Sequence, residues 1–235
     1  MLTVVLFLWH TQQTPHRFES KHVNTMQRML AMHLKVPHRI VLVTDNGHGV
    51  DSRIKCIPID AALTATSRFA KLMLFRPDAA ELFGGSRLLF LDLDLVLLGD
   101  MTALVQRAED FIIWRDPLAT REGYRQTHCY NSSVMLMNAG ARPQLWTQFD
   151  LSRSPETVRR SRLVGSDQAW IGMVLGPNAA VFTQTDGVYG YKHDLNKGRD
   201  LPSNAVLVSC HGRPKPWELE DDHPLRIGYQ QAEAA

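Results

Sequence analysis

The segment 88–98, Leu-Leu-Phe-Leu-Asp-Leu-Asp-Leu-Val-Leu-Leu, constrains the fold most, because it sets two carboxylates into an otherwise apolar run. A continuous run of this kind predicts a strand that is buried on both faces, as in a parallel sheet covered by helices. Residues i and i+2 of a strand point to the same side. We therefore expect Asp92 and Asp94 to face one side where the strand leaves the sheet.

Two ionised carboxylates in an apolar strand need a nearby cation, because burying an unpaired charge costs many kcal/mol. The alternative is a strand that ends in solvent, with the second Asp opening a turn. That alternative is disfavoured because residues 95–98 are again apolar, whereas a turn usually brings polar residues. The pattern therefore favours a divalent metal held by Asp92 and Asp94.

The rest of the chain predicts alternating strands and helices, which is typical of an α/β fold with a mostly parallel sheet. Apolar residues at three- and four-residue spacing predict a helix at 18–35. We expect further helices at 67–83, 101–107, 142–149 and 167–175, and strands at 2–8, 39–44, 53–59, 110–114, 132–137, 179–183 and 205–208. Ligands of open α/β sheets bind at the carboxyl ends of strands, where the Asp pair is expected.

Composition limits the class of protein and its partners. At 235 residues and 44% hydrophobic content, the chain can bury the core of one enzyme-sized domain. The net charge of +2 gives no broad signal for nucleic acid or for an anionic membrane surface. Cys56, Cys129 and Cys210 are few and far apart, which argues against a disulfide framework and fits a reducing compartment.

The first apolar segment, 1–9, is too short to span a membrane and lacks the features of a secretory signal. We therefore expect a cytoplasmic protein without a transmembrane segment. Peripheral contact with a membrane stays open.

A second motif, His-Gly-Arg-Pro-Lys-Pro-Trp at 211–217, directly follows an apolar run and suits diphosphate chemistry. A neutral imidazole from His211 can complete a metal site that carboxylates begin. Gly212 lets the backbone approach a phosphate, and Lys215 supplies a positive charge. The alternative is a rigid surface turn in which His211 and Lys215 are solvated. The unexplained Asp pair favours the site, since each motif supplies what the other lacks.

Two classes of enzyme place Asp-x-Asp at a strand end. Metal-dependent glycosyltransferases use the pair to hold a divalent ion against a nucleotide diphosphate. Haloacid-dehalogenase-like phosphohydrolases use the first Asp as nucleophile and the second as acid or base, usually on the first strand of the core. Here an α/β unit precedes the motif. The phosphohydrolase class would also use Asp221 and Asp222 as a late acidic pair, and it leaves residues 211–217 unexplained.

Five motifs, taken in order, make the chain resemble the GT-A-fold glycosyltransferases, and among them family 8, the group of glycogenin and the bacterial lipopolysaccharide galactosyltransferases. The motifs are Arg68-Phe69-Ala70-Lys71-Leu72, Asp92-Leu93-Asp94, Tyr130-Asn131-Ser132-Ser133-Val134, Gly165-Ser166-Asp167-Gln168 and Gly212-Arg213-Pro214-Lys215-Pro216-Trp217. The resemblance covers most of the chain, and the joint order is much more specific than any single motif. It implies a Rossmann-like, mixed and mostly parallel sheet flanked by helices in a single domain, 1–235. The nucleotide-binding half would be about 1–100 and the acceptor-side half about 101–235.

The resemblance also implies roles for the matching residues. Asp167 and Gln168 would be the catalytic residues beside the anomeric carbon of the transferred sugar. The residues that bind the nucleotide sugar would be Lys71, Asp92, Asn131, Gly212 and Lys215. Ser133 and Ser166 stand where the family pattern has glycines.

The implied metal site would use Asp92 and Asp94 to hold a divalent ion that bridges the two phosphates of the donor. The metal-binding His of the family falls at Ser209 in this sequence, so we expect the nearby His211 to be the third ligand. Carboxylates together with an imidazole favour Mn2+, with Mg2+ as the second candidate.

The predicted function is transfer of a hexose from a nucleotide-diphosphate sugar, with UDP as the expected nucleotide and retention of the anomeric configuration. The acceptor is unknown. A saccharide or a glycolipid is the expected class, the segment 115–130 is its expected contact surface, and no nucleic acid is expected as a partner. Two alternatives stay open: a haloacid-dehalogenase-like phosphohydrolase that uses Asp92 and Asp94, and a non-catalytic module that binds nucleotide sugars.

Overall fold

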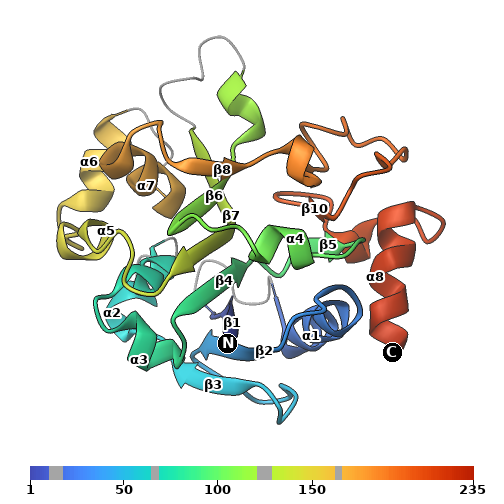
Figure 1. Ribbon diagram of the computed structural model, residues 1–235, viewed down its shortest axis with the longest axis horizontal. Coiled ribbons are helices and arrows are strands. Elements are labelled where there is room, and N and C mark those ends of the chain that lie inside the picture. The colour runs from blue at the N-terminus through green and yellow to red at the C-terminus, as the bar shows by residue number, and fades with distance from the viewer. Residues whose placement is uncertain (11–17, 65–68, 121–128, 162–165) are drawn as a thin grey trace.

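The centre of the molecule is a seven-stranded mixed sheet (Figure 1). The computed structural model describes residues 1–10, 18–64, 69–120, 129–161 and 166–235. The strands of this sheet are β1 Leu2–Leu8, β2 His38–Thr44, β3 Lys55–Pro58, β4 Arg87–Leu91, β6 Phe111–Arg115, β7 Tyr130–Asn138 and β8 Ala180–Phe182. Their order across the sheet is β3-β2-β1-β4-β7-β6-β8. Strand β7 runs antiparallel to β4 and β6, whereas the other neighbouring pairs are parallel.

A second, three-stranded sheet lies beside the first. Its strands are β5 Leu95–Leu97, β9 Val188–Gly190 and β10 Leu207–Ser209. The middle strand, β10, is antiparallel to β5 and parallel to β9. The register places Ser209 opposite Leu95, and the Cys210 backbone N–H donates to the Asp94 carbonyl at 2.9 Å. The small sheet therefore holds the segment after β10 next to the Asp-Leu-Asp motif.

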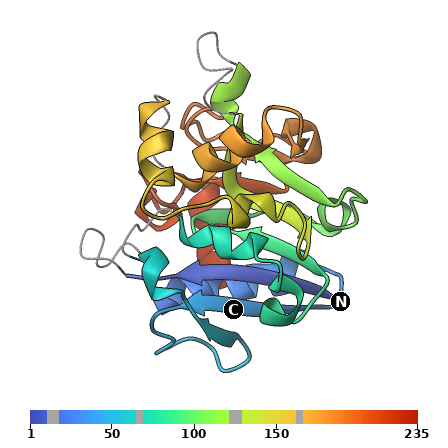
Figure 2. The ribbon, with the colours of Figure 1, turned by 90° about the vertical axis from the view of Figure 1, so that its left-hand side faces the viewer.

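Helices cover both faces of the large sheet, which gives the layered arrangement seen in Figures 1 and 2. Successive β1 side chains alternate between the two faces, so that Val4 and Leu6 enter one core and Val5 and Phe7 the other. The first core includes α1 Ser20–His33, the small sheet and α8 Pro224–Ala234. The second core includes η1 Ala70–Phe75, where η marks a 3₁₀ helix, together with α3 Ala79–Phe83, α5 Gln144–Thr147, α6 Ser154–Arg160 and α7 Asp167–Leu175. Further helical segments are α2 Ala61–Thr64, α4 Thr102–Val105, η2 Pro117–Thr120, η3 Gln184–Asp186 and η4 Pro216–Glu218.

These elements confirm the expected α/β class with a mixed, mostly parallel sheet flanked by helices in a single domain. The strand expected at 2–8 is β1 and the helix expected at 167–175 is α7, both with the predicted bounds. The division into a nucleotide-binding half and an acceptor-side half stays a prediction.

The apolar run 88–98 is not the single strand that was expected. Strand β4 ends at Leu91 in the large sheet, β5 begins at Leu95 in the small sheet, and Asp92 and Asp94 lie in the turn between them. The residues that follow the turn are apolar because they form β5, which pairs with β10 and is buried in the first core. The prediction that the two carboxylates lie along one extended strand is therefore wrong.

The helix expected at 67–83 is also interrupted. Within the described residues the segment forms η1, ends at Arg76 in an extended conformation (φ −61°, ψ 142°), and restarts as α3. Pro77 accounts for the break, because the residue before a proline is pushed out of the helical region. Residues 65–68, which include the expected N-cap Ser67 and Arg68, lie outside the described residues.

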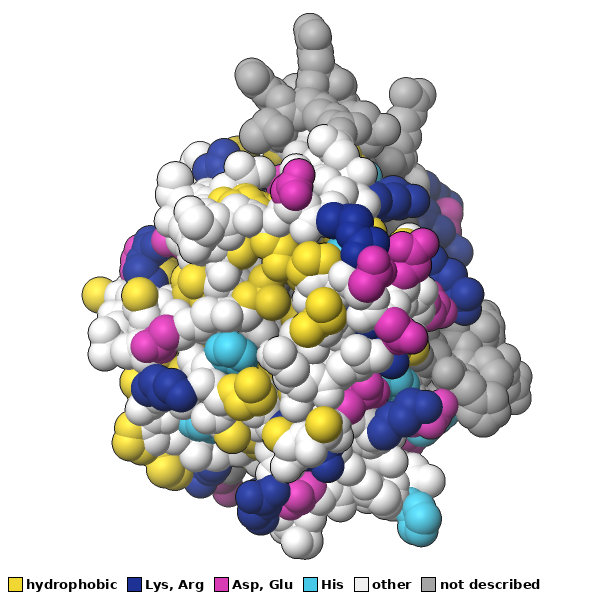
Figure 3. Space-filling model, turned by 90° about the vertical axis from the view of Figure 1, so that its right-hand side faces the viewer, with side chains coloured by type: hydrophobic (Ala, Val, Ile, Leu, Met, Phe, Trp, Pro, Cys, Tyr) yellow, Lys and Arg dark blue, Asp and Glu magenta, His cyan; other side chains and the backbone are white. Residues whose placement is uncertain are grey.

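The face of the molecule in Figure 3 carries charges of both signs, and hydrophobic side chains gather nearer the middle of that face. Large exposed hydrophobic side chains of the described chain include Ile227 of α8, which is 41% exposed. In the parts of the chain that the structure describes, none of the helices combines the length and the apolar character that crossing a membrane requires.

His22 is a buried histidine on α1 whose protonation affects stability. It is 3% exposed, its ring stacks on Trp217 with 4.0 Å between centroids, and its Nδ1 accepts a hydrogen bond from the Glu19 N–H. Burial, with a smaller contribution from Lys21, lowers the pKa of His22 to about 4. Folding therefore favours the neutral ring.

We expect the free energy of unfolding to fall as the pH drops from about 6.5 to 4, with roughly 3 kcal/mol of the loss due to His22. The sign follows because the unfolded chain binds a proton at His22 in this range and the folded chain does not. Urea unfolding at pH 7 and pH 4.5 measures the difference. His22→Gln should flatten the pH dependence, whereas His48→Gln, at an exposed position, should leave it as in the wild type. A wild-type pH dependence in His22→Gln would show that other groups dominate.

Candidate functional site

The Asp-Leu-Asp turn is held by both sheets at the carboxyl end of β4. The Asp92 backbone N–H donates to the Ser133 carbonyl of β7 at 2.9 Å. The other end of the turn is held by the small sheet, through the hydrogen bond from Cys210 to the Asp94 carbonyl. The turn is thus a fixed connection between the two sheets, and its two carboxylates reach different partners.

Lys71 of η1 joins two of the expected site carboxylates. Its Nζ lies 2.8 Å and 2.9 Å from the two carboxylate oxygens of Asp92, and 3.9 Å from Asp167 Oδ2. Burial opposes ionisation of Lys71, but Asp92 and Asp167 outweigh it and raise its pKa. Lys71 is therefore a charged lysine between two carboxylates. The alternative, that Lys71 is a solvated residue on a helix surface, is excluded.

Lys215 pairs with Asp94 in the interior. The lysine is 4% exposed and the aspartate 5%, and their charged atoms are in direct contact. Lys215 Nζ also lies 3.4 Å from the Cys210 carbonyl and 5.4 Å from the centre of the Phe18 ring. Its backbone N–H donates to Glu218, which closes the first turn of η4 and fixes the root of the side chain. The alternative in which Lys215 is solvated on a surface turn is therefore wrong.

His211 lies between this ion pair and strand β6. Its ring stacks on His193 at 5.4 Å and meets the edge of Trp114 at 6.1 Å between centroids. Its Nδ1 is buried and has no hydrogen-bond partner among the described residues. Burial lowers the pKa of His211, although the nearby Asp94 opposes the shift. A neutral imidazole with an unpartnered nitrogen is the form that can bind a metal.

Asp167 begins α7 and points its carboxylate into the same region. It is 6% exposed, and its Oδ2 has no hydrogen-bond partner in the described ranges. The neighbouring Gln168 is half-buried. Gly165 of the same motif lies outside the described residues.

The other two expected donor-binding residues are Asn131 and Gly212. Asn131 of β7 is buried, and its Oδ1 accepts a hydrogen bond from the Ser133 N–H at 2.9 Å. Gly212 is exposed with φ +80°, a conformation that favours glycine. Their contacts with a donor stay predictions.

The donor set of Asp92, Asp94 and His211 has suitable chemistry for a divalent transition metal, since carboxylates and neutral imidazole are usual ligands. In the described ranges, however, no three His, Cys, Asp or Glu side chains are grouped closely enough to hold an ion. Each carboxylate is neutralised by a lysine instead. Metal binding therefore stays a prediction, and it requires the lysines to exchange partners.

A cavity of about 400 Å³ is bordered by Trp114, whose ring also contacts His211. Its walls are residues 114–117 at the end of β6, residues 183–185 around η3, Val188 and Asp194. Trp114 contributes to the cavity and to the ring contact with His211, so the cavity adjoins the candidate site. No motif in the sequence predicted this cavity, although the segment 115–130 was expected to contact an acceptor, and 115–117 do line it. Residues 121–128 of that segment lie outside the described residues.

No family model matches this chain, and no curated protein matches it. Solved structures do match. The galactosyltransferase LgtC, solved with donor and acceptor sugar analogues, has a TM-score of 0.66 at 14% identity, with 99% of this chain and 95% of LgtC covered. The glycosyltransferase GlyE of Streptococcus pneumoniae TIGR4 has a TM-score of 0.65 at 14% identity, covering 100% of this chain and 61% of GlyE. Mouse xyloside xylosyltransferase 1 has a TM-score of 0.52 at 13% identity, covering 90% and 99%.

The structural neighbours are GT-A glycosyltransferases, and LgtC belongs to family 8. The expected GT-A fold is therefore confirmed for this chain, at a sequence identity that demonstrates the fold alone.

Proposed function

We propose that the protein is a metal-dependent glycosyltransferase that moves a hexose from a UDP-sugar to a saccharide-bearing acceptor, with retention of the anomeric configuration. One observation carries the proposal. Two lysines and three carboxylates converge at the carboxyl end of β4 in a GT-A fold, namely Lys71, Lys215, Asp92, Asp94 and Asp167. The scattered free cysteines support the cytoplasm as its location.

Lys71 and Lys215 are the proposed contacts to the diphosphate. A divalent ion, when bound by Asp92, Asp94 and His211, would neutralise negative charge on the two phosphates. The two lysines would then turn from the carboxylates to phosphate oxygens, where they stabilise the charge that develops on the leaving diphosphate. Lysine suits this exchange because its ammonium is a point charge on a flexible stem.

Asp167 is the proposed stabiliser of the transferred sugar. Transfer breaks the bond between the anomeric carbon and the phosphate oxygen, and the electron pair leaves with the diphosphate. The sugar then becomes electron-poor until a bond forms from the anomeric carbon to the acceptor oxygen, whose proton passes to the leaving diphosphate. A buried carboxylate whose Oδ2 has no hydrogen-bond partner among described residues can stabilise that positive charge, and Gln168 beside it can position the sugar hydroxyls.

The cavity beside His211 is the proposed acceptor site. Asp116, Gln184 and Asp194 on its wall offer polar groups for sugar hydroxyls, and the buried Trp114 supports the wall from behind. Its location next to Trp114 and His211 supports entry of an acceptor hydroxyl from this side.

The two alternatives are not favoured. The matching solved structures named above are glycosyltransferases, and they give the phosphohydrolase no support. In the structure the proposed late acidic pair of a phosphohydrolase, Asp221 and Asp222, is exposed and forms ion pairs with Arg226 and Arg199. Turnover of the donor separates a transferase from a binding module.

We expect calorimetry to detect UDP binding in the presence of Mn2+ and much weaker binding without it. Asp92→Asn should weaken Mn2+-dependent UDP binding by more than about 100-fold, since loss of a residue that merely supports a metal ligand already costs 10–100-fold. Mn2+-dependent release of UDP from UDP-glucose or UDP-galactose should accompany binding in the wild type.

Asp222→Asn is the matched control, because it removes an exposed carboxylate that only the phosphohydrolase hypothesis requires. It should leave UDP binding and turnover unchanged. Unchanged UDP affinity in Asp92→Asn, or release of phosphate from p-nitrophenyl phosphate that Asp222→Asn abolishes, would overturn the proposed function.

A further inference from the structure

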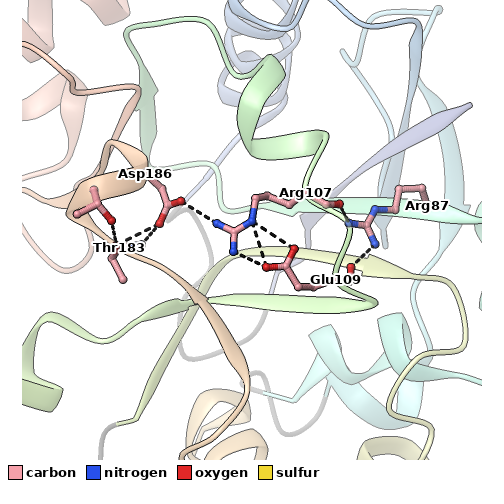
Figure 4. Close-up of polar contacts among 6 residues, drawn as sticks. Arg87, Arg107, Glu109, Thr183 and Asp186 are labelled. Atoms are coloured by element: carbon pink, nitrogen blue, oxygen red, sulfur yellow. Dashed lines mark hydrogen bonds and ion pairs between the residues drawn. The ribbon is translucent and has the colours of Figure 1, made fainter.

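A charged network connects the cavity wall to the large sheet (Figure 4). Arg107, in the segment between α4 and β6, forms ion pairs with Glu109 and with Asp186, the latter through Nη1 and Oδ1 at 2.8 Å. The Arg107 carbonyl accepts a hydrogen bond from Arg87 Nη2 at 2.6 Å, and Arg87 Nη1 donates to the Glu109 carbonyl at 2.7 Å. Arg87 is the first residue of β4. Arg107 is therefore held at two places, its backbone carbonyl by Arg87 and its guanidinium by Glu109 and Asp186.

Asp186 uses its second oxygen to close the η3 turn. The Thr183 N–H and the Thr183 hydroxyl donate to Asp186 Oδ2 at 2.9 Å and 3.1 Å, and the Asp186 N–H donates back to the Thr183 carbonyl at 3.0 Å. Asp186 therefore holds the turn with one oxygen and Arg107 with the other. In Figure 4 it lies between Arg107 and Thr183.

The turn held in this way is a wall of the cavity. Thr183, Gln184 and Thr185 line it, and Gln184 Nε2 donates to Asp194 Oδ1 at 2.8 Å on the neighbouring wall. Asp194 in turn accepts from the Gly190 N–H at 2.7 Å. Displacement of the turn would move the Gln184 and Asp194 side chains together.

The same network contributes little to holding the protein folded. The side chains of Arg107 and Asp186 are 33% and 20% exposed. Ion pairs this accessible change an equilibrium by about fivefold at most. Their loss should therefore alter the position of the turn without unfolding the domain.

We propose that Arg107 is a positioning residue which, through Asp186, holds the 183–186 turn as a wall of the acceptor cavity and so sets the affinity for a saccharide acceptor. This inference rests on the proposed function. In this role Arg107 contacts neither the donor nor the reacting atoms. Its replacement should therefore change the affinity for the acceptor and not the affinity for the donor.

The experiment compares Arg107→Gln, Asp186→Asn and the double variant with the wild type. The donors are UDP-glucose and UDP-galactose with Mn2+, and the acceptor probes are the α and β anomers of p-nitrophenyl glucoside and galactoside. Asn at 186 keeps an acceptor for Thr183 but loses the charge that pairs with Arg107. Asp110→Asn is the control, since Asp110 forms an ion pair with Arg142, through two hydrogen bonds, and neither residue lines the cavity.

Each single variant should raise the acceptor KM about fivefold while the donor KM and the acceptor-free hydrolysis of the donor stay unchanged. The double variant should be no worse than either single one, because both break the same pair. Arg107→Lys should recover part of the acceptor affinity, since it keeps a positive charge near Asp186. The Asp110→Asn control should match the wild type.

An unchanged acceptor KM in the single variants, equal loss of donor and acceptor affinity, or additive effects in the double variant would overturn this role for Arg107. The same holds if the wild type hydrolyses the donor but transfers to none of the four probes, because the cavity would then not be a hexoside site. If the wild type neither binds UDP nor turns over either donor, the proposed function itself fails.

Discussion

Replacing Asp94 with Ala should lower the free energy of unfolding by about 3–5 kcal/mol, because it leaves the Lys215 ammonium buried without its partner. The desolvation cost of a buried ion is offset mainly by its counter-charge, and among the described residues Lys215 Nζ has one further polar contact, the Cys210 carbonyl at 3.4 Å. Urea unfolding at pH 7 measures the loss. The variant should also lose Mn2+-dependent UDP binding.

A second variant separates the charge effect from lost packing. Asp94→Ala combined with Lys215→Met removes both ions and keeps an apolar side chain of similar length, so most of the stability should return while UDP binding stays absent. Asp92→Ala is the comparison, because Lys71 keeps Asp167 at 3.9 Å and the site is more exposed there. Asp92→Ala should lower the free energy of unfolding clearly less than Asp94→Ala does. Equal destabilisation in Asp94→Ala and in the double variant would mean that the buried charge is not the cause.

Asp167→Asn should reduce kcat by on the order of 10²–10³ while UDP affinity changes little, if Asp167 stabilises the electron-poor sugar. Asn keeps the shape of the side chain and its place at the start of α7 but removes the charge. Lys71 retains Asp92 as its partner at 2.8 Å, so the donor-binding side of the site should persist.

Steady-state kinetics with UDP-glucose or UDP-galactose, together with calorimetry of UDP, tests this role for Asp167. Glu156→Gln is the control, since it neutralises an exposed carboxylate in the first turn of α6. A variant with normal kcat and weakened UDP binding would assign Asp167 to donor binding alone.

The elements most accurately predicted from the sequence were those with long, regular patterns. Strand β1 was found because its apolar run is continuous, and α1 because its helical spacing extends over many residues. The run 88–98 was misread because an apolar pattern indicates burial and does not reveal which sheet buries it. The break at Arg76 could have been found, since Pro77 follows it directly.

Residue type and order singled out Lys71, Asp92, Asp94 and Lys215 as candidate site residues, but the pairing of each lysine with its carboxylate was not predicted. The sequence indicated that Asp92 and Asp94 need a cation, and the structure supplies Lys71 and Lys215 as those cations. These partners are 21 and 121 residues away from the carboxylates they contact. The spacing of residues within a short motif cannot predict contacts over such sequence separations. The cavity and the Arg107 network were missed for the same reason, since Arg107 and Asp186 are 79 residues apart.

The separation between Asp94 and Lys215 also bears on the order in which the chain folds during synthesis. At about 5–20 residues per second, the 121 residues from Leu95 to Lys215 take roughly 6–24 s to make. During this interval the Asp94 carboxylate lacks its partner, and β5 lacks β10, the strand with which it pairs. Strands β1 to β4 can already pair with one another. The parallel half of the large sheet can therefore form early, whereas the edge that carries the candidate site must stay hydrated until β10 and Lys215 have been made.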